Sequence, residues 1–417
     1  MSRVSRRGRI LAAIAVLALG GSGVRLRTAT AGPQETPPLR PVRLEGLAVL
    51  PALTIIQPPS DAPESCRRAG RHARPGRGEV NGLSLPLGGQ PVQGLSGLEP
   101  LGDGTLLAVS DNGFGTRDNS VDALLMLHRL EPRWETGELR VRETLFLRDP
   151  DRRLPFAIVH ETTRERYLTG ADLDPESLRR VGETLWIGDE FGPYLLRADL
   201  TGRLTALFEA RLGGRTLRSP DHQAWPSSSP GPGIEVRRSR GFEGLGSSPD
   251  GRFLYPVLEG PIEGESGTRI LEFDLAAFAF TGRSWTYALA GGDHAIGDFI
   301  LLEAKAGLLI ERDGGEGDEA HFKRLCRVTL KEDGTASRGR CVDLLDIADP
   351  DAHARGRGSG GRYRMPFQTI EGLARVDDVR VVVANDNNLP FSSGRVPGRP
   401  DDTELALLRV DELLRDR

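Results

Sequence analysis

Short apolar runs that end on polar turn residues recur along the chain and predict a fold built almost entirely from β-strands. Runs of this length, bounded by glycine, proline and Asp-Gly turns, are typical of buried strands, whereas sustained helical periodicity is nearly absent. The clearest runs are TLLAV (105–109), ALLMLHRL (123–130), TLWIG (184–188), YLLRADL (194–200), RILEFDL (269–275), GLLIER (307–312), RVVVAND (380–386) and LALLRV (405–410). Only brief segments such as 411–417 read as helix.

One arrangement of strands and polar residues is repeated five times. A Ser, Glu or Asp beside small residues opens a strand, a turn follows, and a second apolar strand ends on an acid roughly 13 to 16 residues later. In GLSGLEPLGDGTLLAVSDNG (94–113) the opening residue is Ser96 and the closing acid is Asp111. The openings lie at Ser96, Glu176, Glu243, Asp298 and Glu371. Internal repetition on this scale predicts an array or a propeller.

The predicted fold class is an all-β propeller of about six four-stranded blades. This number comes from the five repeats together with flanking strands at 43–57 and 402–410. The two terminal strands are expected to share one blade and so close the ring without a free edge. A pair of β-sandwiches is the alternative, but it does not explain why each strand runs into an acid. In a propeller, equivalent positions of successive blades converge on the central channel.

The first 31 residues have the pattern of an export signal. Arg3, Arg6, Arg7 and Arg9 precede a short apolar run, and Ala29-Thr30-Ala31 offers a cleavage site. Ser5-Arg6-Arg7 resembles a twin-arginine start, which leaves the export route open. We therefore expect a signal peptide at 1–31, a Pro-rich lead-in at 32–42 and one domain at 43–417. The mature protein is expected in the periplasm or outside the cell, without a membrane span.

The charge balance argues against nucleic acid as a partner. The 417-residue chain has a formal net charge of −4, and residues 1–31 hold six Arg and no acids, so the remainder carries −4 − 6 = −10. An acidic chain without a long Lys/Arg block is a poor nucleic-acid binder. If the substrate is an anion, a bound cation is the obvious means of offsetting the repulsion.

The repeated acids are the candidate functional residues. Asp111, Glu190, Glu259, Glu311, Glu371 and Asp386 are the expected metal ligands. All-oxygen ligands without His or Cys partners suit Ca²⁺ or Mg²⁺ rather than zinc. Asn112 and Asn387 are candidate substrate-binding amides, and Arg312 is expected either to neutralise a carboxylate or to hold a phosphate in bidentate fashion. For Glu243 and Glu371 a purely structural role, accepting backbone N–H groups between blades, is an equally good reading.

Two of the three cysteines lie in one predicted hairpin. A turn at Asp333-Gly334 places Cys326 opposite Cys341, and a disulfide there suits an oxidising compartment. Two independent strand cysteines are the equal alternative. Cys66, in the polar segment SCRRAGRHARPGRG, is expected to be a free surface thiol, and its spacing gives no metal signature.

Several longer motifs, in this order, resemble one family of exported bacterial proteins. They are GLSGL…SDNG, GDEFGPYLLRADLTGRL, RGFEGLGSSPDGRFLYPVLEG, LLIERD and IEGLARVDD…NDNN. Together they resemble the esterase-like activity of phytase family, over about residue 43 to the C-terminus. The resemblance implies a β-propeller acting on phosphoesters such as phytate, and it places family acids at Asp111, Glu190, Glu243, Glu259, Glu311, Glu371 and Asp386. The long Arg-rich insertions at 58–80, 212–240 and 350–364 depart from the family pattern.

Two function classes follow. The first is an exported metal-dependent hydrolase of a small phosphoester or carboxylic ester, in which Glu190 or Glu243 protonates the leaving alcohol and Arg312 stabilises the reacting oxygens. The second is a non-catalytic propeller that binds a glycan, peptide or envelope partner and uses the acids and metal to rigidify the ring. Aromatic residues make up only 6% of the chain, which argues against a large aromatic binding surface and favours the enzyme. A monomer is expected in either case.

Overall fold

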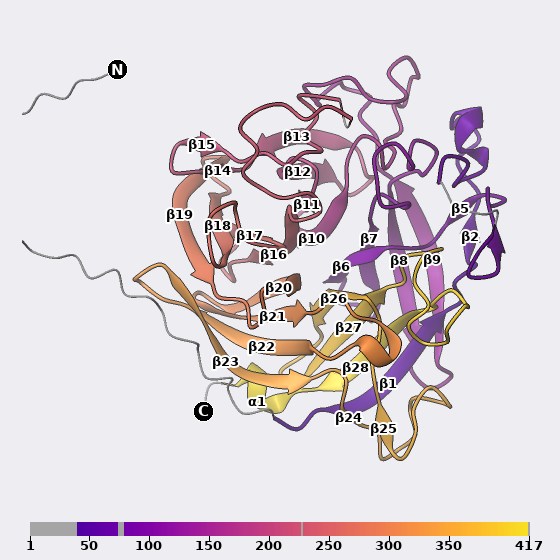
Figure 1. Cartoon of the computed structure of the whole chain (residues 1–417), viewed down its shortest axis with the longest axis vertical. Helices are drawn as coiled ribbons and strands as arrows, with labels where there is room; N and C mark the ends of the chain where they lie inside the picture. Colours follow the sequence, from indigo (N-terminus) through magenta and orange to yellow (C-terminus); the bar gives the residue numbers. More distant parts are fainter. Residues whose placement is uncertain (1–39, 74–78, 227, 416–417) are drawn as a thin grey trace, which may run out of the picture. The chain divides into compact units, whose positions relative to one another are not determined.

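The apolar runs form five four-stranded antiparallel blades, which we call A to E (Figure 1), and parallel pairing at their outer edges joins two pairs of blades into larger sheets. The computed structural model describes residues 40–73, 79–226 and 228–415. These residues belong to a unit that spans 36–417. The expected signal peptide at 1–31, and the lead-in up to residue 39, lie outside the described residues.

Blades A, B and C follow one another in sequence order. Blade A consists of β6 (Leu95–Pro100), β7 (Leu106–Ser110), β8 (Met126–Arg133) and β9 (Glu138–Phe146). Blade B consists of β10 (Pro175–Val181), β11 (Thr184–Asp189), β12 (Tyr194–Asp199) and β13 (Leu204–Glu209). Blade C consists of β16 (Phe242–Ser247), β17 (Phe253–Leu258), β18 (Thr268–Asp274) and β19 (Ala279–Tyr287).

Blades D and E complete the set, and blade E combines both ends of the domain. Blade D consists of β20 (Ala295–Glu303), β21 (Ala306–Arg312), β22 (Lys323–Leu330) and β23 (Thr335–Asp343). Blade E consists of β26 (Thr369–Arg375), β27 (Arg380–Asp386), β28 (Thr403–Arg409) and β1 (Arg43–Leu50). Arg43 lies opposite Arg409, so the N-terminal strand closes the ring against the C-terminal one, as the sequence predicts.

The first strands of the five blades form a closed ring. β6 contacts β10, β10 contacts β16, β16 contacts β20, β20 contacts β26, and β26 contacts β6 again (Figure 1). The fold is therefore a β-propeller. The predicted number of about six blades is wrong, because the terminal strands at 43–50 and 403–409 share the sheet of β26 and β27 instead of adding a blade of their own.

Apolar side chains fill the space between neighbouring blades at one equivalent position of each inner strand. These five side chains are fully buried: Leu98, Leu178, Leu245, Phe299 and Leu373. Glycine beside them permits the close approach. A Cβ at Gly97 would lie 2.8 Å from the backbone nitrogen of Leu178, and one at Gly244 would lie 2.7 Å from that of Phe299. Neither glycine has a positive φ, so their role is close contact between blades.

The remaining elements are short and lie in the connections. They are β2 (Ile55–Ile56), η1 (Glu64–Arg67), β3 (Glu79–Val80), β4 (Leu83–Ser84), β5 (Gln90–Pro91), β14 (Arg211–Leu212), β15 (Arg215–Thr216), η2 (Gly317–Glu319), β24 (Ile347–Ala348), β25 (Arg362–Tyr363) and α1 (Asp411–Leu414). Within the described ranges no helix is long and apolar enough to cross a membrane.

Two of the three cysteines lie in blade D, and the third lies in the segment before blade A. Cys326 of β22 lies directly opposite Cys341 of β23, and the two form a disulfide. Cys66 is buried, in contrast to the predicted surface thiol. Burial raises its pKa to about 11, and its Sγ lies 3.1 Å from Nε2 of His160.

Candidate functional site

A β-bulge recurs near the start of every inner strand and sets the first layer of the channel. In each blade one residue has no partner on the second strand, which lets its side chain leave the regular alternation of the sheet. The five bulge residues are Ser96, Glu176, Glu243, Gly297 and Glu371. Three of the five blades therefore place a glutamate at the same position of the ring.

A second layer is set by the end of the second strand in each blade. In each blade, the residue just before the bulge pairs with a residue near the end of the second strand. The next residue along the chain occupies an equivalent position in all five blades. These residues are Asp111, Glu190, Glu259, Arg312 and Asp386. The layer thus has four acids and one cation, and the cation belongs to blade D, where the first layer has only Gly297.

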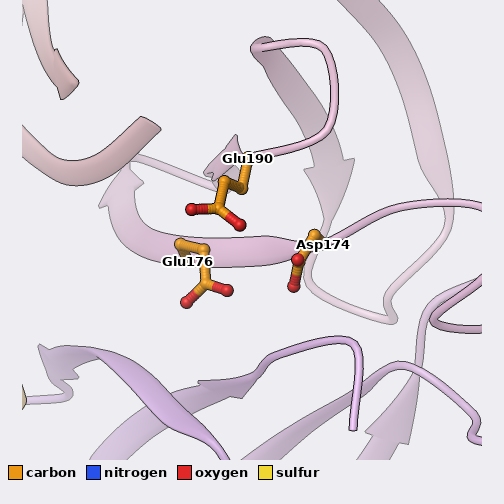
Figure 2. Close-up of side chains that lie close together, drawn as sticks. All are labelled: Asp174, Glu176 and Glu190. Atoms are coloured by element: carbon orange, nitrogen blue, oxygen red, sulfur yellow. The ribbon is translucent and has the colours of Figure 1, made fainter. Parts of the chain in front are cut away.

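Five carboxylates of these layers and Asp174, which precedes Glu176 by two residues, form one continuous cluster. Three trios each have oxygen atoms that all lie within 4.8 Å of one another: Asp174, Glu176 and Glu190; Glu176, Glu243 and Glu371; and Glu190, Glu243 and Glu259. Figure 2 shows the first trio, with Glu176 on β10 and the other two side chains on the adjoining segments. Because Glu176, Glu190 and Glu243 each belong to two trios, they link blades B, C and E.

Arg312 is the principal counter-charge inside the cluster. Its Nη2 donates hydrogen bonds of 2.8 Å to both Glu259 Oε1 and Glu371 Oε1, and it lies 3.9 Å from Glu243 Oε1. Three carboxylates around one buried guanidinium raise its pKa. Arg240 forms a second ion pair with Glu259 from the more exposed side. Within the described part of the chain, Nε of Arg312 is buried without a hydrogen-bond partner.

Burial and mutual repulsion raise the pKa of several of these carboxyl groups. The pKa values of Glu176, Glu190 and Glu243 are well above the ordinary range, first because the groups lose contact with water and second because neighbouring carboxylates repel their charge. The pKa of Asp174 is raised to about 6 and that of Asp386 to about 7, again mainly by burial. The site therefore combines proton donors with potential cation ligands.

We expect the melting temperature of the chelator-treated protein to fall by at least about 5 °C as the pH rises from about 4 to about 8. The folded-state pKa is raised to about 6 for Asp174, about 7 for Asp386 and about 8 for Asp189, against about 3.9 for an unfolded Asp. In this window the native state binds more protons than the unfolded state, so stability is lost as the pH rises through the folded values. Thermal melts in EDTA at stepped pH test this, and a constant or rising melting temperature would contradict it.

The structure brings together most, but not all, of the predicted metal ligands. Glu190, Glu259 and Glu371 lie in the trios. Asp111 and Asp386 adjoin them, since the charge of Asp386 helps to raise the pKa of Asp111. Glu311 lies elsewhere, because it precedes Arg312 by one residue and the two side chains leave the strand on opposite faces.

The carboxylate of Glu311 is held in a hydrogen-bond network of its own. It accepts hydrogen bonds from Tyr287, the Ala290 backbone, His294 and Arg338. Hydrogen bonds and the nearby guanidinium lower its pKa despite its burial. Its expected place among the metal ligands is therefore corrected: Glu311 braces blade D, and Arg312 is the residue that reaches the channel.

The two predicted substrate-binding amides differ in their freedom to bind. Asn112 donates to Asp174 at 2.6 Å, and its Oδ1 accepts the backbone N–H groups of Phe114 and Gly115, so its amide is already used. Asn387 accepts only a 3.3 Å hydrogen bond from Gly94, and its Nδ2 is buried without a partner among the described residues.

Asp174, Glu176 and Glu243 are the members of the cluster absent from the predicted metal ligands, and Glu243 was predicted as a catalytic residue instead. Glu176 was visible in sequence as the opening residue of its repeat. Asp174 occupies the position two residues before it, where the other repeats have Gly94, Gly241, Ala295 and Thr369, so no repeat signal marks it.

The donor set suits a hard divalent cation. The three trios offer only carboxylate oxygens, with no His or Cys, which is the ligand preference of Ca²⁺ and Mg²⁺. Among the described residues, Arg312 and Arg240 supply the ion pairs to these six acids, so the acids outnumber their counter-charges and a bound cation would offset those that are ionised.

Comparison with known proteins places this geometry in a family. The family model described as "Phytase-like: Esterase-like activity of phytase" matches residues 90–389, from the start of blade A to the end of β27. The chain belongs to this family. The match includes all five inner strands and both layers of channel residues, and the family description supports a hydrolase-type function.

One curated relative and several solved structures are also similar. An uncharacterised secreted protein from Arthroderma benhamiae is 26% identical over 113 residues, which covers 22% of this chain; the chain spans only 22% of that relative's length. Among solved structures, a glutaminyl cyclase from Myxococcus xanthus is 14% identical, with 76% of this chain and 92% of that chain covered and a TM-score of 0.36. A calcium-binding regucalcin from Agrobacterium tumefaciens is also 14% identical, with 77% of this chain and 92% of that chain covered and a TM-score of 0.35. At such TM-scores these structures carry no argument, and the propeller assignment rests on the strand topology.

Proposed function

We propose that this member of the phytase-like family is an exported hydrolase of ester bonds, with phosphoric monoesters as the first substrate class and carboxylic esters as the second. The observation that carries the proposal is the set of shared carboxylates, Glu176, Glu190 and Glu243, each of which belongs to two trios within ligand distance. The family description and the secreted relative support the reaction class and the export.

The chain's own residues would hold a divalent cation between blades B, C and E. Glu176 and Glu190 would supply the shared ligands, with Asp174, Glu259 and Glu371 beside them, while Glu243 would keep its proton. When bound, such a cation supplies positive charge that offsets an anionic substrate and polarises a phosphoryl or carbonyl oxygen.

The proton donor in this proposal is Glu243, with Glu190 as the alternative. A carboxyl group whose pKa is raised holds its proton to a higher pH than an ordinary glutamate does, and it can transfer that proton to the oxygen of the leaving alcohol. Arg312 orients Glu259 and Glu371 through its two 2.8 Å hydrogen bonds, and its unpartnered Nε is a donor for a substrate oxygen.

Burial restricts what can enter the site. Glu176 and Glu190 keep 8% and 7% of their surface accessible, and Glu243 keeps 3%. A single phosphoryl or acyl group fits this access better than a bulky ligand. The same near-complete burial is the observation that favours the rival function, a non-catalytic propeller in which the acids and a metal only stabilise the ring.

The deciding experiment is hydrolysis of phytate, p-nitrophenyl phosphate and p-nitrophenyl acetate by the purified protein, with Ca²⁺, with Mg²⁺ and with chelator. Phosphate release that the chelator abolishes is the expected result. Cleavage of the acetate alone would assign the site to carboxylic esters. Absence of all activity, together with a melting temperature that rises with Ca²⁺, would overturn the enzyme and support the binding propeller.

A further inference from the structure

A second concave site lies among the loops of blade E, apart from the channel carboxylates. It is a cleft of about 700 Å³ formed by the segments 355–366 and 394–402 together with Gly317 and Asp318. Six arginines line it: Arg355, Arg357, Arg362, Arg364, Arg395 and Arg399. The acids in its lining are Asp318 and Asp402, and none of the six cluster carboxylates takes part.

The lining keeps an excess of positive charge after its internal ion pairs are counted. Six guanidiniums against two carboxylates give 6 − 2 = +4 for the lining. Two further acids pair with lining arginines from outside it, Glu404 with Arg357 and Arg395, and Asp346 with Arg362. With these included the excess is 4 − 2 = +2, in a chain whose overall charge is negative.

Two of the arginines are held in place by a buried anchor. Glu404 is fully buried and accepts hydrogen bonds from Arg357 at 2.8 Å, from Arg395 at 2.7 Å and from the Tyr363 hydroxyl at 2.6 Å. The Arg395 guanidinium also lies over the rings of Tyr363 and Phe367, at 5.3 and 4.9 Å from their centroids. These side chains are fixed before any ligand arrives, which reduces the entropy cost of binding.

Three other arginines keep their charge uncompensated. Arg364 and Arg399 are exposed and have no carboxylate partner within the described ranges. Arg355 donates to the backbone carbonyls of Trp134 and Glu135, which leaves it without a neutralising acid. The anchored arginines are half-buried and the unpaired ones exposed, an arrangement that attracts an anion and can hold it by forked hydrogen bonds.

We propose that this cleft binds a small polyanion that carries two or more phosphate groups. A volume of about 700 Å³ lies within the usual range for small-molecule sites. Guanidinium groups suit phosphate oxygens, and arginines spread along both sides of the cleft suit separate anionic groups of one ligand. The site does not depend on the proposed hydrolysis: the ligand is either an anion that only binds here or a substrate whose non-reacting phosphates bind here.

Isothermal titration of the whole protein with tripolyphosphate, in EDTA so that no divalent cation bridges the ligand to the channel, tests the proposal. We expect saturable one-to-one binding that the double variant Arg364→Gln/Arg399→Gln weakens by at least about tenfold. The matched control is Arg153→Gln/Arg164→Gln, which removes two exposed arginines outside the cleft. Both variants should melt close to the temperature of the unchanged protein, because neither Arg364 nor Arg399 has an ion pair among the described residues, and the surface pair of Arg164 with Glu165 contributes little.

Three outcomes would overturn the assignment. They are absence of saturable binding, equal affinity in the cleft variant and the unchanged protein, and equal affinity for citrate, which would show recognition of charge rather than phosphate. Retained binding in a Glu243→Gln protein is expected and separates this site from the channel. If Arg364→Gln/Arg399→Gln also raises KM for phytate, the phosphates belong to the substrate; an unchanged KM assigns a separate ligand.

Discussion

Replacing Glu243 by glutamine is expected to lower kcat/KM for the best ester substrate by about 10²- to 10⁴-fold, the usual contribution of a positioned general acid. Glutamine has the shape of the protonated carboxyl group that burial and neighbouring acids favour at this position, but it cannot transfer a proton. The variant should therefore fold with an unchanged or slightly higher melting temperature while losing turnover.

The matched control for this substitution is Glu272→Gln. Glu272 is also a buried carboxylate of blade C, but it accepts hydrogen bonds from Tyr255 and Thr281, away from the channel cluster. Its replacement should leave kcat/KM unchanged. Steady-state kinetics on both variants decides the matter: activity close to that of the unchanged protein in Glu243→Gln would exclude Glu243 as the proton donor and leave Glu190 to be tested in the same way.

Replacing Arg312 by glutamine is expected to reduce the free energy of unfolding of the chelator-treated protein by about 3–5 kcal/mol, the usual cost of removing one partner of a buried ion pair. The substitution leaves Glu259 and Glu371 without their shared 2.8 Å donor in a cluster that is already rich in negative charge. Added Ca²⁺ should restore much of this loss, because a cation held by the carboxylates replaces the missing positive charge.

The control for the second substitution is Arg338→Gln in the same blade. Arg338 also pairs with a buried glutamate, Glu311, yet that carboxylate keeps its hydrogen bonds from Tyr287, Ala290 and His294. Denaturant melts should show a loss that Ca²⁺ does not reverse. Equal rescue of both variants by Ca²⁺, or no rescue of Arg312→Gln, would count against cation binding by the channel carboxylates.

The β-propeller fold could be predicted from the sequence because every repeat contains a strand, a turn and a closing acid in the same order. What the repeat could not give was the number of blades. Strands 43–50 and 403–409 look in sequence like additional elements, and only their pairing across blade E shows that they belong to one sheet with β26 and β27. Pairing between residues so distant in sequence leaves no local pattern.

Two errors in the candidate site, at Asp298 and at Glu311, come from the β-bulge and from the alternation of side chains along the strand. In blade D the bulge lies at Gly297, so the position equivalent to Glu243 is a glycine and not the neighbouring Asp298. Asp298 instead accepts the backbone N–H groups of Phe299 and Leu373 between blades. The alternation of side chains along a strand likewise separates Arg312, which faces the channel, from Glu311, which does not. A bulge that shifts the register by one residue moves each side chain to the other face of the strand, and the positions of the acids in the sequence do not reveal such a shift.

The pairing of β1 with β28 has a consequence for how the ring is assembled. A chain synthesised from its N-terminus can complete the hairpins of blades A to D from local contacts, but β1 has no antiparallel partner until residues 403–409 have emerged. The pairing of β1 with β28 joins the strands that are farthest apart in sequence and therefore has the largest loop-entropy cost. We expect this pairing to be the slow step of folding. Until that step, the β1 edge lacks its antiparallel partner. The contact of β26 with β6, which brings the channel strands of blades E and A together, also waits for residues 369–375. An export route that delivers an unfolded chain would therefore postpone assembly of the acid cluster until after translocation.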